Sequence, residues 1–66
     1  MEIKIWEMRV KKNVSLTKLS QKTGISRSAL NRYENEEREI SIQKLEKIAE
    51  ALGCKINDLF ESKYKW

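Results

Sequence analysis

Apolar residues recur at helical spacing along this chain of 66 residues, in segments separated by short polar breaks. In the clearest segment, Leu45, Ile48, Ala49 and Leu52 fall at i, i+3, i+4 and i+7, which places them on one face of a helix. The same spacing predicts helices over about residues 2–12, 16–22, 27–34, 42–52 and 56–61. The sequence therefore predicts an all-α fold, a compact five-helix bundle, with a tail at residues 62–66.

The polar breaks carry residues suited to starting and ending helices. Serine is a favoured N-cap, and three of the predicted helices follow a serine: Ser15, Ser26 and Ser41. Glycine and asparagine tolerate the left-handed conformation that commonly ends a helix, and they follow three of the segments: Asn13, Gly24 and Gly53. These residues support the predicted boundaries.

Composition and charge add a hint about the partner. With 39% hydrophobic and 36% charged residues, the chain is apolar enough to fold, and we expect residues 1–66 to form one domain. The net charge of +4 is uneven: residues 1–33 carry eight Lys/Arg and two acids, whereas residues 34–66 carry six and eight. A basic half suggests a face that binds a polyanion. Charge alone is equally compatible with an unevenly charged soluble surface.

Several classes of site lack the residues they need. The sequence has no histidine and a single cysteine, Cys54, so we expect neither an intrachain disulfide nor a metal site. It also has no Gly-rich phosphate loop and no nucleophile beside an evident base, so we expect no enzyme and no cofactor. The apolar runs are too short for a membrane span or a signal peptide. We therefore expect a cytoplasmic protein in which Cys54 is reduced and fills space in the core.

Residues 15–35 predict a helix, a glycine-containing turn and a second helix. Leu19, Ile25 and Leu30 are placed to pin the two helices together, and the small Ser20 allows a close approach. Gly24 can adopt a positive φ at the turn without steric cost. Helical hairpins are common, so this unit alone does not define a function.

The face left free on the second of these helices carries Arg27, Ser28, Asn31 and Arg32. In the DNA major groove, arginine can donate two hydrogen bonds to guanine, asparagine can pair with adenine, and serine can reach either base. Taken alone, these four residues are more commonly part of an ordinary solvated helix face. Further evidence is needed to favour base recognition.

An ordered set of residues over about residues 3–61 matches a known pattern. Its members are Ile5, Met8-Arg9, Val14-Ser15, Leu19-Ser20, Gly24-Ile25-Ser26, Tyr33-Glu34-Asn35, Ser41, Leu45, Ile48-Ala49, Leu52-Gly53 and Leu59-Phe60. None of them is specific alone, but the set at these spacings is. With this set, the chain resembles the lambda-repressor-like (Cro/CI, xenobiotic-response-element type) helix-turn-helix DNA-binding family.

The resemblance implies a five-helix bundle whose third helix lies in the major groove. By position, Arg27, Ser28 and Arg32 would read base edges, with Asn31 beside them. The start of the second helix would contact the phosphates of the DNA backbone. The backbone contacts we expect are Ser15, Thr17, Lys18, Lys22, Ser26 and Arg38.

The resemblance also implies a structural ion pair, in which Arg9 of the first helix holds Glu34 at the end of the third. Two positions depart from the family pattern. Leu16 stands where many relatives have a glutamine that binds phosphate, and Glu36 stands where the family usually has glycine. We expect Asn35 to take the left-handed conformation in place of that glycine.

These features predict a regulator of transcription that binds double-stranded DNA. We expect a repressor that binds an inverted repeat as a homodimer, with half-sites about 34 Å apart. The last helix and the aromatic tail, Tyr64 and Trp66, are candidates for the dimer interface, although the tail could equally fold onto its own domain. The alternative function is an antitoxin or adaptor whose main partner is another protein, bound by the acidic loop at residues 36–39 and the aromatic tail.

Overall fold

A computed structural model of the protein describes residues 2–61, so the predicted tail, with Tyr64 and Trp66, lies outside the described residues. Four α-helices make up most of the described chain: α1 (Ile5–Lys11), α2 (Leu16–Thr23), α3 (Arg27–Glu34) and α4 (Ile42–Leu52). A 3-10 helix, η1 (Ile56–Asp58), follows α4. Two short strands, β1 (Glu2–Ile3) and β2 (Phe60–Glu61), form an antiparallel sheet.

The three predicted serine N-caps are confirmed. Each serine oxygen accepts a hydrogen bond from the backbone N–H three residues later, at 3.1–3.2 Å: Ser15 from Lys18, Ser26 from Ala29 and Ser41 from Lys44. These bonds satisfy one of the free N–H groups at each helix start. The caps set the first residues of α2, α3 and α4.

The helix ends agree with the sequence at three places and differ at one. Asn13 (φ 58°), Gly24 (φ 76°) and Gly53 (φ 68°) all adopt the left-handed conformation that the sequence predicted for them or permits. After α3, however, Asn35 has φ −90° and Glu36 has φ 58°. The expectation that Asn35 would replace the family's glycine is therefore wrong. The reason is the capping geometry, because Glu37 N–H reaches back to the Arg32 carbonyl and this leaves the left-handed position to Glu36.

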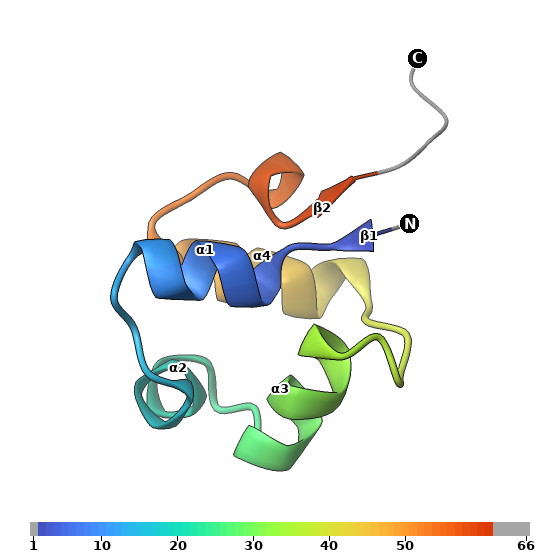
Figure 1. The fold of residues 1–66 in the computed structure, drawn as a ribbon. Helices are drawn as coiled ribbons and strands as arrows, with labels where there is room; N and C mark the ends of the chain where they lie inside the picture. Colours follow the sequence, from blue (N-terminus) through green and yellow to red (C-terminus); the bar gives the residue numbers. More distant parts are fainter. Residues whose placement is uncertain (1, 62–66) are drawn as a thin grey trace.

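The core lies where the four α-helices and the segment after η1 meet. In Figure 1, α1 and α4 lie alongside each other, and α2 and α3 sit together beneath them. Side chains from every α-helix are buried there, and Leu59 closes the core from the C-terminal segment. The buried core residues are Ile5, Leu19, Ile25, Leu30, Tyr33, Leu45, Ile48, Ala49, Leu52 and Leu59.

The first and last predicted helices require correction, because the described chain has four α-helices and not five. Residues 2–3 are not helical: they pair with residues 60–61, and the Lys4 N–H donates to the Leu59 carbonyl at 2.7 Å. The predicted helix at 56–61 is a single 3-10 turn followed by a strand, since the chain must turn back to meet β1. The fold is mostly helical, with a small two-stranded sheet where the two ends of the described chain meet (Figure 1).

None of the helices within residues 2–61 combines the length and the apolar character that crossing a membrane requires.

Candidate nucleic-acid interface

The turn between α2 and α3 is held by side-chain hydrogen bonds as well as by apolar packing. Ser20 Oγ donates to the Ile25 carbonyl at 2.6 Å. Thr23 Oγ1 donates to the Leu19 carbonyl at 2.8 Å and accepts from the Ile25 N–H at 3.2 Å. Gly24 supplies the positive φ between the helices. Ser20 thus does more than permit the close approach expected of a small residue, since it also ties the turn to α2.

The four residues expected to read bases lie on one exposed face of α3. Leu30 and Tyr33 are buried against the core, which fixes the rotation of the helix. The opposite face is then exposed to solvent, and its residues are Arg27, Ser28, Asn31 and Arg32. The structure therefore brings together, on one accessible surface, side chains that can donate to and accept from base edges.

Arg27 contacts α2 across the turn. Its Nη1 donates to Thr17 Oγ1 at 3.2 Å, and both residues are exposed. The sequence pattern did not indicate this contact, because the two residues are ten positions apart on different helices. The hydrogen bond joins Arg27, which is expected to read bases, to Thr17, which is expected to contact the DNA backbone.

The starts of α2 and α3 offer several groups suited to phosphate. The oxygens of Ser15 and Ser26 cap the helices, but a hydroxyl that accepts a bond still has its own proton to donate. Lys18 is exposed in the first turn of α2. The positive end of each helix dipole adds to the attraction for an anion. The starts of α2 and α3 therefore carry a group of possible phosphate ligands next to the exposed face of α3: Ser15, Thr17, Lys18 and Ser26.

Asn31 has a neighbour that the sequence analysis missed. Asn35 Nδ2 donates to Asn31 Oδ1 at 3.4 Å, a long bond between exposed side chains one helical turn apart. The i, i+4 spacing was the available signal, since residues at that spacing are neighbours on a helix. The contact leaves the Asn31 amide N–H groups free to donate.

Arg9 and Glu34 form a two-pronged ion pair between α1 and the end of α3. Arg9 Nε donates to Glu34 Oε2 at 2.8 Å and Nη2 donates to Oε1 at 3.1 Å. Nη1 also donates to the Val14 carbonyl at 3.2 Å. The side chains are only 14% and 5% exposed, so little water competes with the bonds. The pair attaches the exposed helix α3 to the scaffold.

A second attachment, absent from the sequence prediction, joins α3 to α4. Lys44 Nζ donates to the hydroxyl of the buried Tyr33 at 2.9 Å and lies 5.4 Å from the centre of its ring. These two distances place the ammonium beyond the hydroxyl, at the edge of the ring, so the hydrogen bond is the contact that joins the two helices. Nothing in the spacing of residues 33 and 44 indicated the contact, because it depends on how α3 and α4 pack.

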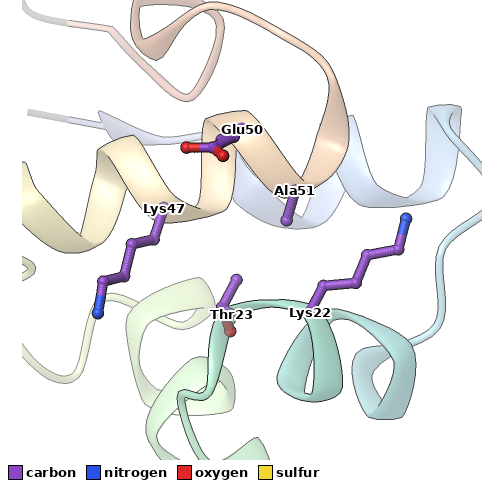
Figure 2. A pocket seen from close by; sticks show the side chains of 5 residues that line it. All are labelled: Lys22, Thr23, Lys47, Glu50 and Ala51. Atoms are coloured by element: carbon purple, nitrogen blue, oxygen red, sulfur yellow. The ribbon is translucent and has the colours of Figure 1, made fainter.

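Lys22 and Arg38 lie farther from the starts of α2 and α3. Lys22 is in the last turn of α2 and lines an open hollow of about 230 Å³ with Thr23, Lys47, Glu50 and Ala51. Figure 2 shows the Lys22 and Lys47 amines pointing to opposite ends of this hollow. Arg38 follows α3 and lines another hollow beside Glu36 and Glu39.

The comparison with known families agrees with this geometry. Residues 4–63 match the sequence profile described as the Cro/C1-type HTH DNA-binding domain, where HTH denotes helix-turn-helix. The chain belongs to this family. The resemblance inferred from the sequence is thus confirmed, and the Cro/C1-type domain has DNA as its partner. The family is a DNA-binding one and is not typically enzymatic.

A curated relative shares part of its sequence with this Cro/C1-type domain. It is a protein of Sulfolobus acidocaldarius with the name "Putative HTH-type transcriptional regulatory protein". The two are 42% identical over 53 residues, which are 80% of this chain and 17% of the relative. The chain therefore spans about a sixth of that relative's length.

Within residues 2–61, no cluster of three or more histidine, cysteine, aspartate or glutamate side chains is arranged to hold a metal ion. Cys54 packs against the core but is only half-buried. Burial raises the pKa of its thiol, the Asp58 carboxylate raises that pKa further, and Lys12 opposes both effects. A raised pKa keeps the thiol protonated and unreactive at neutral pH.

Proposed function

We propose that the protein is a sequence-specific regulator of transcription that reads double-stranded DNA with α3 in the major groove. The observation that carries this proposal is the exposed face of α3, held against a rigid scaffold. Leu30 and Tyr33 bury the opposite face, and ion-pair and hydrogen-bond contacts attach the helix to α1 and α4. A recognition helix needs this rigidity, because base contacts depend on accurate placement.

In this proposal, Arg27 and Arg32 donate to guanine, Asn31 pairs with adenine, and Ser28 bonds a neighbouring base edge. Contacts with the DNA backbone come from hydroxyl and basic residues that set the register of α3 on the duplex. The residues proposed for this role are Ser15, Thr17, Lys18, Lys22, Ser26 and Arg38. Those at the helix starts are the best placed, and Lys22 and Arg38 would reach phosphates farther along the duplex.

One such module reads few base pairs, so we propose that the protein acts as a homodimer on an inverted repeat. Half-sites one helical turn apart, about 34 Å, would bring the two α3 helices to the same side of the duplex. A dimer bound at a promoter would occlude RNA polymerase, which makes repression the simplest outcome.

Selection from random-sequence duplex DNA tests the proposal. The wild-type protein is expected to enrich an inverted repeat, and Arg27→Ala and Arg32→Ala are each expected to lose the preference at particular base pairs. Lys55→Ala is the control, because it removes the same charge from an exposed position outside α2 and α3. The assignment of α3 fails if the wild type enriches no sequence, or if Lys55→Ala alters the preference as much as the arginine variants do.

A second candidate function, binding of a partner protein, is favoured by the exposed side of α1. Trp6 and Val10 lie one helical turn apart and are 53% and 50% exposed. Tryptophan is enriched at protein interfaces, so an exposed tryptophan beside a second exposed apolar side chain suits a contact with a partner protein. Trp6 also lines a hollow with Glu2, Glu7 and Glu36, which gives the surface an acidic rim. An antitoxin or adaptor would use this side.

Co-purification of the wild type and a Trp6→Ser/Val10→Ser variant from the source cells tests this candidate. Loss of a stoichiometric partner from the variant, with DNA selection unchanged, would establish the protein-binding function. Recovery of the same partners with both proteins, or of none with either, would reject it.

A further inference from the structure

The contact between Thr17 and Arg27 is the starting point for an inference about how bases are selected. Thr17 is the second residue of α2 and Arg27 is the first residue of α3. The threonine hydroxyl accepts a hydrogen bond from Arg27 Nη1 at 3.2 Å. Leu16, which precedes Thr17, has no polar atom on its side chain to offer, so Thr17 supplies the acceptor from this part of α2.

This bond restricts the arginine in a specific way. The guanidinium group is planar and its five N–H donors have a fixed arrangement. Holding Nη1 therefore limits the rotation of the whole group, while Nε, Nη2 and the remaining Nη1 proton stay available. An arginine that is already ordered loses less side-chain entropy when it binds a base. A fixed orientation also favours the base that presents two acceptors in the right place, which is guanine.

We propose that Thr17 is a positioning residue that orients Arg27 and thereby sets the preference for guanine at the base pair that Arg27 reads. The inference rests on the proposed function, since it assumes that Arg27 contacts a base. It replaces the direct phosphate contact proposed above for the Thr17 hydroxyl and leaves the other proposed backbone contacts unchanged. The two roles predict different effects of Thr17→Val on DNA binding, depending on whether Arg27 is present.

Binding measurements on Thr17→Val, Arg27→Ala and the double variant test the proposal. Valine keeps the branched shape of threonine but removes the hydroxyl, and Thr17→Ser keeps the hydroxyl. Each protein is titrated with the duplex selected by the wild type and with a duplex altered at the one base pair whose preference Arg27→Ala relaxes. A third duplex, altered at the pair that Arg32→Ala relaxes, is the control.

The expected result for Thr17→Val is a reduction of about three- to tenfold in discrimination at the Arg27 base pair, the range of a single hydrogen bond. Discrimination at the Arg32 base pair stays unchanged, and Thr17→Ser restores the wild-type preference. In the Arg27→Ala background, Thr17→Val has no further effect, because the residue that Thr17 positions is absent.

Two results would overturn the proposal while leaving the proposed function intact. If Thr17→Val weakens binding to every duplex equally, and does so in the Arg27→Ala background as well, the hydroxyl binds phosphate directly. If Thr17→Val discriminates as the wild type does, the hydroxyl has no role in base selection. A wild-type protein that discriminates among no duplexes would instead overturn both the function and this inference.

NMR of the free protein checks the same contact without DNA and shows whether the variants are folded. Rotation about the Arg27 Nε–Cζ bond is expected to be slower in the wild type and Thr17→Ser than in Thr17→Val, with the spectrum otherwise unchanged. Equal rotation rates in all three folded proteins would show that Thr17 does not orient the guanidinium.

Discussion

Among the described residues, four have a positive φ, and each lies just after an α-helix: Asn13, Gly24, Glu36 and Gly53. Glycine adopts this conformation at no steric cost and asparagine tolerates it. For other L-residues the left-handed conformation costs about 1–2 kcal/mol of conformational free energy. Glu36 therefore carries backbone strain at the end of α3. The hydrogen bonds from Glu36 N–H to the Tyr33 carbonyl and from Glu37 N–H to the Arg32 carbonyl hold it there.

Relief of this strain gives the first prediction. Glu36→Gly should increase the free energy of unfolding by about 0.5–1 kcal/mol, because the steric gain exceeds the entropy that glycine adds to the unfolded chain. Glu37→Gly removes the same charge from a neighbouring exposed residue without a positive φ, and it should lower stability slightly. Urea denaturation of both variants measures the difference. A loss of stability in Glu36→Gly would show that the backbone is not strained there.

Cys54 gives a prediction about alkaline pH. Because burial raises the pKa of its thiol in the folded protein, the folded state favours the protonated thiol. The resulting stabilisation is complete below the ordinary thiol pKa of about 8.5 and is lost as the pH rises through the higher folded value. Between pH 8 and 10, the wild type should therefore lose more stability than Cys54→Ala. If the free energy of unfolding falls equally in the two proteins over this pH range, the thiol pKa is not raised in the folded state.

At this scale, much of the site could be predicted from the sequence. The three serine caps and the exposed face of α3 follow from residue type and helical spacing, which are local properties. The contacts of Arg27 with Thr17 and of Tyr33 with Lys44 could not be predicted from spacing, because they join different helices and depend on packing. The prediction that Asn35 takes the left-handed conformation was wrong, because the hydrogen bonds that end α3 place that conformation at Glu36 whatever the preference of the two side chains.

At the scale of the elements, α3 is attached at its C-terminal end to both neighbouring helices. Arg9 holds Glu34 from α1, and Lys44 holds Tyr33 from α4. The N-terminal part of α3, which carries Arg27 and Ser28, is exposed instead. This division suits a helix whose end is fixed to the scaffold while its start projects into a groove.

The Arg9–Glu34 pair gives the prediction at this scale. Glu34→Gln should lower the free energy of unfolding by about 3 kcal/mol, because it leaves the nearly buried Arg9 guanidinium without its charge partner. Glu61→Gln is the matched control. Its ion pair with Lys4 is exposed, with side chains 50% and 39% accessible, and such pairs contribute less than about 1 kcal/mol. Similar losses in the two variants would mean that burial does not strengthen the Arg9–Glu34 pair.

Helical periodicity predicted the central helices well and the two ends of the described chain poorly. The predictions for α2, α3 and α4 are close to the observed bounds, because each has a cap and a full apolar face. The segments at residues 2–4 and 56–61 have apolar residues at compatible spacing, but they pair with each other across the fold. That pairing is a long-range contact, which a local pattern does not reveal.

At the scale of the whole molecule, the fold determines where the uneven charge of the sequence lies on the surface. The basic N-terminal half contains both α2 and nearly all of α3, so positive charge accompanies the exposed face of α3. The acidic side chains of Glu2, Glu7 and Glu36 line a hollow beside Trp6 instead. This hollow is lined by residues of β1, α1 and the end of α3, and not by the starts of α2 and α3, and such an uneven arrangement of charge would orient the domain in the field of a duplex.

The salt dependence of DNA binding tests this arrangement. Neutralising a phosphate releases counterions, so Lys18→Ala should reduce the slope of log K against log salt concentration by about one while the selected sequence stays the same. Lys55→Ala should leave the slope unchanged. An altered sequence preference in Lys18→Ala, or an equal change of slope in Lys55→Ala, would contradict the proposed role of the start of α2.

The central claim is that DNA contacts the starts of α2 and α3 and the exposed face of α3. An NMR titration of the ¹⁵N-labelled protein with the selected duplex tests it most directly. We predict that the largest changes in amide signals fall at residues 15–18 and 26–32, and that the amides of Trp6 and Val10 on α1 change little. Changes concentrated around Trp6, Val10 and Glu36, with α3 unaffected, would contradict the claim and assign DNA binding to a different face.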